Sequence, residues 1–200
     1  MIEFRARDLT AFHDSRHAVP GWAKSTPTAG RNALWSAVED NHRYNCLLWD
    51  EEDLARRRQV SDAEIAANKR AIDGYNQKRN DAIERIDEEL LAALAGVALK
   101  TEARLNSETA GAMADRLSIL SLKIHHMRLQ TKRTDVDRAH IEACEAKLAR
   151  LVEQRADLGA ALDRLITEAA RGDAYFKVYR QFKMYNDPRL NPAMYGEKKG

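Results

Sequence analysis

The sequence has almost no proline outside its two ends, and this absence governs the fold we expect. All the prolines lie at Pro20, Pro27, Pro188 and Pro192, so the long stretch between Pro27 and Pro188 carries none. Proline breaks a helix because it lacks the backbone N–H and clashes with the preceding turn. Apolar residues recur at helical spacing throughout the proline-free stretch, and no segment alternates as a strand does. The sequence therefore predicts an all-α fold.

Cysteine, net charge and long apolar runs are also scarce. Cys46 and Cys144 are far apart and match no metal-binding or redox spacing, so we assign no metal ligands and expect two buried thiols. A net charge of +2 provides no field that would attract nucleic acid. The N-terminus lacks the apolar core of a signal peptide, and no run approaches the ~20 residues of a membrane span. We expect a cytoplasmic protein with neither a nucleic-acid partner nor a membrane span.

The composition suits a single helical domain over residues 1–200. Hydrophobic residues make up 44% of the chain and charged residues 32%, as in long helices with solvated faces. Ser61 with Glu64 forms a capping box, Thr134 with Asp137 suggests a second helix start, and Ser107 or Thr109 a third. Short connections favour an antiparallel bundle of four long helices plus a short C-terminal aromatic helix. The expected order is an irregular arm (1–30), helices at 32–59, 61–95, 107–130, 134–172 and 174–185, and an extended tail (186–200).

The third long helix is apolar on two sides. Arg116 and Lys123 fall between the two apolar arcs, and Asp115 falls inside one of them. Buried charges cost several kcal/mol unless they are paired. We therefore predict that Arg116 and Lys123 are buried and face polar groups from other helices. The face left for solvent consists of Ser118, Ser121, His125 and Arg128.

Polar residues interrupt the apolar seam of every long helix, so an antiparallel arrangement would let them converge on one pocket. The candidates for binding an anion such as phosphate or carboxylate are basic and carboxamide side chains: Asn45, Arg56, Lys69, Asn76, Arg79, Arg116, Lys123 and Arg155. The candidates for acid–base catalysis are His42, Asp73, Glu108 and Asp115. The acidic residues are equally suited to neutralising the cations or to holding a divalent ion. The competing interpretation is a structural salt-bridge network without a ligand.

Two further groups of residues have simpler interpretations. His42 and His126 lie on predicted inward faces, where a lone histidine is often a core residue, whereas His13, His17, His125 and His140 look exposed. Residues 175–185 interleave aromatic and basic side chains, which suits either a stacking surface for nucleic acid or an amphipathic helix on the bundle. The near-neutral net charge favours the amphipathic helix.

Several of these segments occur together in one family. They are His42-x-x-Asn45-x-x-Leu48-Trp49-x-x-Glu52-Asp53-x-Ala55-Arg56, Lys69-Arg70-x-Ile72-Asp73-x-x-Asn76-x-x-Arg79-Asn80, Asn106-Ser107-Glu108-Thr109-x-Gly111, Asp115-Arg116-Leu117-Ser118-Ile119-Leu120-x-Leu122-Lys123-Ile124 and Tyr179-Arg180-Gln181-Phe182-Lys183-Met184-Tyr185-Asn186-Asp187-Pro188. From the first long helix onward, the chain resembles the bacterial family called domain of unknown function 4254. It departs from the family pattern at Ala110, where a proline is expected. The resemblance implies a setting among lipopolysaccharide and surface-polysaccharide genes, and it implies no reaction.

Two functions from different classes fit these observations. The first is binding, with or without conversion, of a phosphorylated sugar or sugar nucleotide in a polar pocket between the helices. The second is a non-catalytic scaffold that docks on a glycosyltransferase or another glycan-assembly enzyme, with the polar seam setting helix register. A binding site predicts a concave pocket with unpaired cations, whereas a scaffold predicts a fully paired network and an exposed apolar patch. The sequence names no cofactor, and it is compatible with a homo-oligomer.

Overall fold

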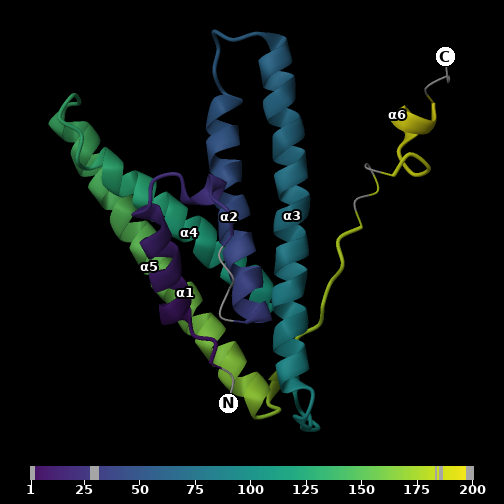
Figure 1. Ribbon diagram of the computed structural model, residues 1–200. Coiled ribbons are helices and arrows are strands. Elements are labelled where there is room, and N and C mark those ends of the chain that lie inside the picture. The colour runs from purple at the N-terminus through teal and green to yellow at the C-terminus, as the bar shows by residue number, and fades with distance from the viewer. Residues whose placement is uncertain (1–2, 28–31, 183, 185–186, 197–200) are drawn as a thin grey trace.

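The computed structural model describes residues 3–27, 32–182, 184 and 187–196 (Figure 1). Its main body consists of two antiparallel helical hairpins that share a base and diverge from it, α2 with α3 and α4 with α5. The element bounds are α1 Ala6–His17, η1 Trp22–Lys24, α2 Ala33–Leu54, α3 Asp62–Leu94, β1 Arg104–Leu105, α4 Ala110–Gln130, α5 Arg138–Ala170, β2 Ala174–Tyr175 and α6 Pro192–Tyr195. Within the described ranges, no helix combines the length and apolar character needed to cross a membrane.

The predicted all-helical character and two of the predicted helix starts are confirmed. Helices α3 and α5 each contain 33 residues, as the long periodic stretches of the sequence suggest. The capping box forms at α3, where the Ser61 hydroxyl accepts from the Glu64 backbone N–H. Thr109 caps α4, whereas the cap of α5 is Asp137 rather than Thr134. The chain leaves α5 through Gly172, whose φ of 74° lies in the left-handed region that favours glycine. A side chain there would also collide with the carbonyl oxygen of Ala98.

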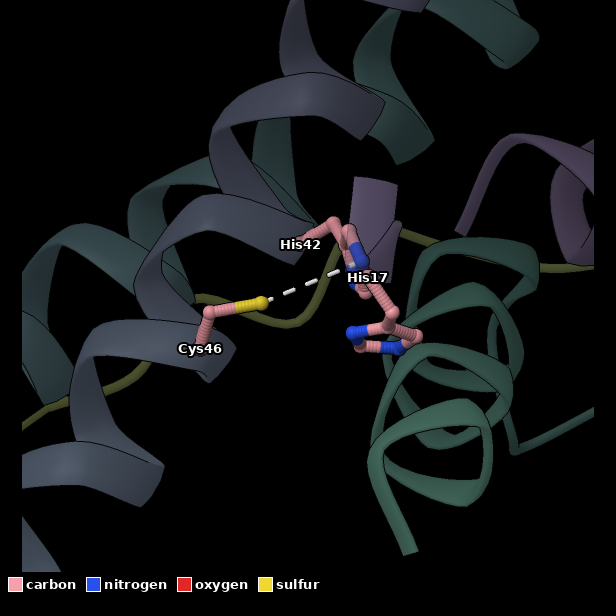
Figure 2. Close-up of side chains that lie close together, drawn as sticks. All are labelled: His17, His42 and Cys46. Atoms are coloured by element: carbon pink, nitrogen blue, oxygen red, sulfur yellow. Dashed lines mark hydrogen bonds between the residues drawn. The ribbon is translucent and has the colours of Figure 1, made fainter. Parts of the chain in front are cut away.

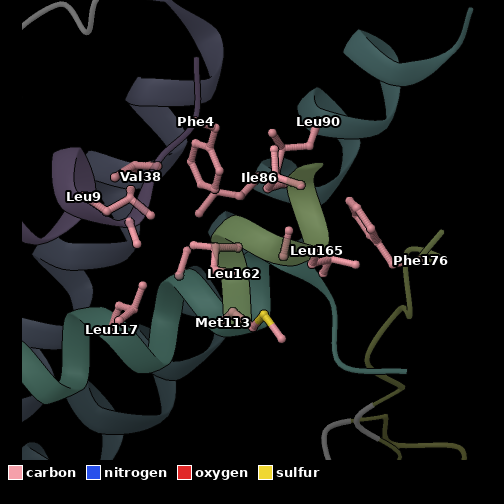
Figure 3. Close-up of a cluster of buried hydrophobic side chains, with 14 of the residues drawn as sticks. Phe4, Leu9, Val38, Ile86, Leu90, Met113, Leu117, Leu162, Leu165 and Phe176 are labelled. Carbon is pink, nitrogen blue, oxygen red and sulfur yellow. The ribbon is translucent and has the colours of Figure 1, made fainter. Parts of the chain in front are cut away.

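The hydrophobic core lies at the shared base of the two hairpins (Figure 3). Ile86 and Leu90 of α3 meet Leu117 of α4 and Leu162 of α5, and all four side chains are fully buried. Burying side chains of this size is worth roughly 1.5–3 kcal/mol each. The core therefore joins the hairpins at one end and leaves their far ends apart.

The N-terminal segment is not the irregular arm that we expected. It contains α1, which lies across α4 and α5 and inserts Leu9 into the core. The segment after α1 is held by Arg43 of α2, which donates to the backbone oxygens of Trp22 and Ser25 at 2.8 and 2.7 Å. These contacts are tertiary, and the short helix has too weak an apolar stripe to reveal them in the sequence. Residues 1, 2 and 28–30 of the expected arm lie outside the described residues.

The expected aromatic helix over 174–185 is also wrong for the described residues. Ala174 and Tyr175 instead pair in parallel with Arg104 and Leu105, and residues 176–182 are not helical. The backbone hydrogen bond from Asn106 N to Tyr175 O measures 2.8 Å, so the ladder satisfies groups that a helix would have paired internally. Residues 183, 185 and 186 and residues 197–200 lie outside the described ranges. The described part of the expected extended tail contains the short helix α6.

Helices α3 and α4 approach closely at Gly111. Its N–H donates to Asp87 Oδ1 at 2.6 Å, and an added Cβ would lie 2.5 Å from Ile83 O. We predict that Gly111→Ala lowers the free energy of unfolding by about 1–3 kcal/mol, the usual cost of overpacking. Gly74→Ala is the control, because a Cβ there meets nothing within 4 Å. It should raise stability by about 0.5–1 kcal/mol through helix propensity. Urea unfolding measures both, and equal changes would contradict the close approach.

Candidate functional site

A buried carboxylate, Asp115 of α4, is the centre of a polar network between the hairpins. Asp115 is 6% exposed, and its Oδ1 accepts from the Nδ2 atoms of Asn41 at 2.8 Å and Asn45 at 2.9 Å. Arg79 of α3 brings its Nε to 3.6 Å from the same oxygen. Asn45 Nδ2 also donates to Ser118 Oγ at 3.0 Å. Groups from two other helices, α2 and α3, thus compensate one buried charge of α4, as a carboxylate away from water requires.

A pocket of about 310 Å³ lies beside this network, between α2, α3 and α4. We call it the α2–α3–α4 pocket. Its lining includes four of the residues predicted to bind a ligand: Asn45, Arg56, Asn76 and Arg79. Asn45 and Arg79 also contact Asp115, so the network positions two side chains of the pocket wall. Arg79 Nε is buried and has no hydrogen-bond partner among the described residues. The wall of the pocket therefore includes a guanidinium whose buried Nε faces Asp115.

A second pocket adjoins the first at Trp49 and Asp53. It measures about 780 Å³, lies between α2, α4 and α5, and is called the α2–α4–α5 pocket below. Trp49 stacks on His126 with ring centroids 4.4 Å apart, and its buried Nε1 has no partner among the described residues. Lysine and arginine side chains from α4 and α5 also line it: Lys123, Lys147 and Arg150. The two pockets together offer an aromatic surface flanked by cations.

Histidines gather on the other side of Ser118, where α1 crosses α2 and α4. His42 is fully buried, and its Nδ1 lies 2.8 Å from Ser118 Oγ. The His13 ring stacks on His42 at 4.4 Å, and the His17 ring stacks on His125 at 4.6 Å. His13 is therefore buried and His17 partly buried, contrary to the exposure expected of them.

Burial sets the protonation of this cluster. Loss of hydration lowers the pKa of His13 to about 3 and that of His17 to about 4, with neighbouring imidazoles adding to both shifts. The pKa of His42 is lowered well below its usual value for the same reason. Burial also raises the pKa of the Cys46 thiol to about 12. At neutral pH the cluster therefore consists of neutral imidazoles beside a protonated thiol.

The prediction that Arg116 and Lys123 are buried is wrong. Both are exposed, and Arg116 pairs with Glu108 in a groove between α4 and α5 that Lys123 also lines. The face assigned to solvent is instead partly interior, since Ser118 and Ser121 are fully buried. The physical reason is the unexpected helix α1, which packs on the serine face of α4. The face of α4 that carries Arg116 and Lys123 is therefore left exposed.

The remaining predicted residues lie away from the α2–α3–α4 pocket. Lys69 and Asp73 are exposed and pair with each other along α3. Arg155 is directed to α1, where its Nη1 donates to Asp14 at 2.8 Å and to Ser121 at 3.3 Å. The expected convergence on one pocket is therefore partial, because helix faces separated by half a turn meet different neighbours.

Sequence reasoning missed several residues of this region: Asn41, Trp49, Ser118, Ser121, Cys46, His13 and His17. One of them carries a signal that was open to inspection. His42 and Cys46 are four residues apart, a spacing that places both on one face of a helix. The others depend on where α1 packs, which no local pattern reveals.

The fold and its site define a class of mostly helical proteins with a buried polar network between two diverging hairpins. Comparison with known families gives the chain its place within that class. The family model described as "Protein of unknown function (DUF4254)" matches residues 35–178, and the chain belongs to this family. No curated protein and no solved structure matches it.

The Asp115 network makes a direct prediction about stability. Asp115→Asn keeps the shape but removes the charge that faces Arg79, and the donors of Asn41 and Asn45 are left with a neutral amide oxygen as a weaker acceptor. We expect a loss of about 1–3 kcal/mol in the free energy of unfolding. The control Asp73→Asn breaks an exposed pair along one helix and should cost less than about 0.5 kcal/mol. Chemical denaturation of both variants checks this. A D115N protein as stable as D73N would show that Asp115 is not the centre of a stabilising network.

The buried histidines predict a loss of stability in mild acid. His13 has a pKa of about 3 when folded against 6.5 when unfolded, so the unfolded chain binds the extra proton between these values. The contribution of neutral His13 to the free energy of unfolding is complete above pH 6.5. It declines as the pH falls, by up to about 1.4 kcal/mol per pH unit. His13→Gln, neutral throughout, should flatten the decline between pH 6 and pH 4. Unfolding curves of the wild type and of H13Q, recorded with a chelator so that no metal binds the histidines, test this. Parallel declines of the two proteins with falling pH would contradict it.

Proposed function

We propose that this protein binds a phosphorylated sugar or sugar nucleotide in the α2–α3–α4 pocket. The observation that carries the proposal is Arg79, a guanidinium that lines the pocket and is held from behind by Asp115, whose Oδ1 lies 3.6 Å from the buried Arg79 Nε. A guanidinium matches the geometry of phosphate oxygens, and Arg56, which pairs with Glu52 at 2.7 Å, lines the same pocket. Phosphate is therefore the group that this wall suits best.

The rest of the lining suits the sugar. The carboxamide of Asn76 offers a donor and an acceptor to hydroxyl groups, and Trp49 offers an apolar ring surface. Asn45 offers only its Oδ1 as an acceptor, because its Nδ2 donates to Asp115 and Ser118. The volume of about 310 Å³ lies at the lower end of ligand pockets, which fits a single phosphosugar. The adjoining α2–α4–α5 pocket leaves room for a nucleoside beyond Trp49. The surface-glycan setting implied by the family resemblance supports this ligand class, and a cytoplasmic location is part of the proposal.

The network behind the pocket determines which residues would act on such a ligand. Asp115 holds Asn45 in place and faces Arg79, so it acts as a positioning residue. His42 contacts the network through Ser118 and is not among the residues lining either pocket. The proposal is therefore one of binding, and it assigns no reaction.

A second candidate function rests on the C-terminal segment. Several large apolar side chains there are exposed: Tyr179, Phe182, Met184, Leu190, Met194 and Tyr195. Phe182 is 87% exposed, which is unusual for a phenylalanine unless a partner covers it. These side chains favour the scaffold that docks on a glycan-assembly enzyme. The two candidates use different parts of the molecule and are separable by experiment.

The binding proposal is tested by thermal unfolding with glucose 1-phosphate, UDP-glucose, glucose and inorganic phosphate as probes. A phosphorylated probe at about 100 times its Kd should stabilise the protein by about 2.7 kcal/mol, and glucose should have no comparable effect. Arg79→Met should abolish the shift while preserving the helical content measured by circular dichroism. Arg116→Met is the matched control, because its side chain is 56% exposed and lies outside the pocket.

Two outcomes would overturn the binding proposal. An identical shift in R79M and R116M would place the ligand elsewhere. Absence of a shift with every probe would leave the scaffold as the better candidate.

A further inference from the structure

Three potential metal ligands meet where α1 crosses α2. One ring nitrogen each from His17 and His42 and the sulfur of Cys46 lie within 4.8 Å of one another (Figure 2). Among the described residues, no other group of three His, Cys, Asp or Glu side chains converges in this way. The cluster is separate from the two pockets described above, since none of its members lines them.

Two of the three ligands are positioned by a single helix. His42 and Cys46 are one turn apart on α2, and Cys46 Sγ lies 3.8 Å from His42 Nε2. Ligands around a tetrahedral Zn²⁺ are about 3.3–3.6 Å apart, given Zn–N and Zn–S bonds of about 2.0–2.3 Å. The pair on α2 is therefore nearly at binding distance, and a shift of about 1 Å in His17 would complete the set.

The tautomer of His42 suits a metal at Nε2. Its Nδ1 lies 2.8 Å from Ser118 Oγ, and a hydroxyl oxygen can accept the Nδ1 hydrogen. The lone pair of Nε2 then faces Cys46. Histidine ligands are commonly oriented in this way, through a hydrogen bond from the nitrogen that does not bind the metal. Ser118 is fully buried, so this orientation is held away from competing water.

His17, the third member of the cluster, has a ring nitrogen without a hydrogen-bond partner in the part of the chain that the structure describes. Its Nε2 is buried and has no hydrogen-bond partner among the described residues. A buried polar atom without a partner costs roughly 1–3 kcal/mol, so such atoms generally indicate a missing ligand or water. The neighbouring His13, which is 1% exposed, likewise has a buried Nδ1 without a partner. The interior of the cluster thus contains two imidazole nitrogens without a hydrogen-bond partner among the described residues.

We propose that His17, His42 and Cys46 bind a zinc ion, with water in the fourth coordination position. Two imidazoles and a thiol are borderline-to-soft ligands that select Zn²⁺ over Mg²⁺ or Ca²⁺. Cys46 binds as the thiolate, and its proton passes to solvent as the Zn–S bond forms. Three protein ligands leave one position open, as in zinc sites that accept an exchangeable ligand.

The zinc site would join α1 to α2 and would touch the pocket wall through one hydroxyl. Ser118 Oγ lies within hydrogen-bond distance of both His42 Nδ1 and Asn45 Nδ2. A metal at His42 would therefore stiffen the side of Asn45 that faces away from the pocket. The zinc proposal does not depend on the phosphosugar proposal, because its ligands lie outside the pocket.

Cobalt substitution in the untagged full-length protein tests the site directly. A Co²⁺ titration should give one equivalent bound, with the near-ultraviolet charge-transfer absorption of a cobalt–thiolate bond, and Zn²⁺ should abolish that absorption. Cys46→Ala should remove the band. His17→Gln, on a different helix, should weaken Co²⁺ binding at least tenfold. Circular dichroism shows whether each variant remains folded.

The chain provides its own control. Cys144 Sγ lies 3.4 Å from Nε2 of His140, one turn away on α5. This pair resembles His42 with Cys46, but no third ligand joins it in the described parts of the chain. Cys144→Ala should leave the cobalt band and stoichiometry unchanged. The proposal fails if wild-type protein gives no thiolate band. It also fails if folded C46A retains the band or if C144A is the variant that loses it.

Discussion

Burial of the Asp115 carboxylate is the constraint on which the arrangement of the helices depends. A carboxylate in this interior is tolerated only because Asn41 and Asn45 of α2 donate to it and Arg79 of α3 faces it. Rotating or sliding any of the three helices would leave a charge or a donor unpaired. The apolar core at the base joins the hairpins, whereas this network specifies their relative register. The attraction of Asp115 also explains why the Arg79 side chain lies in the wall of the α2–α3–α4 pocket rather than extending into solvent.

Helix α1 converts one face of α4 from surface into interior. Asp14 of α1 accepts from Arg155 of α5, which also donates to Ser121 of α4, so one guanidinium connects three helices. The same helix brings His13 and His17 against His42. The histidine cluster thus forms because α1, which carries His13 and His17, covers the face of α4 that carries Ser118 and Ser121. Its neutral imidazoles account for both the acid sensitivity and the affinity for a soft metal that we propose.

The two proposed sites are neighbours with a shared support. Ser118 lies between His42 and Asn45, and Asn45 connects it to Asp115 and the pocket wall. A buried hydrogen-bonded chain whose members are all paired is rigid, because each member has few alternative partners inside the protein. Occupancy of the metal cluster would accordingly reduce the freedom of Asn45. Trp49 plays a different part, since it lines both the smaller α2–α3–α4 pocket and the larger α2–α4–α5 pocket.

The sequence by itself determined the helical fold, the long α3 and α5, the Ser61 capping box and four residues of one pocket, Asn45, Arg56, Asn76 and Arg79. These follow from local backbone chemistry and from helical periodicity, which places side chains on common faces. Periodicity does not say which neighbour covers a face, so the exposure of Arg116 and the burial of Ser118 were both misjudged. The spacing of His42 and Cys46 is visible in the sequence, but the approach of His17 is not. Only tertiary packing decided that approach, because α1 docks through contacts with residues more than a hundred positions away, such as Arg155.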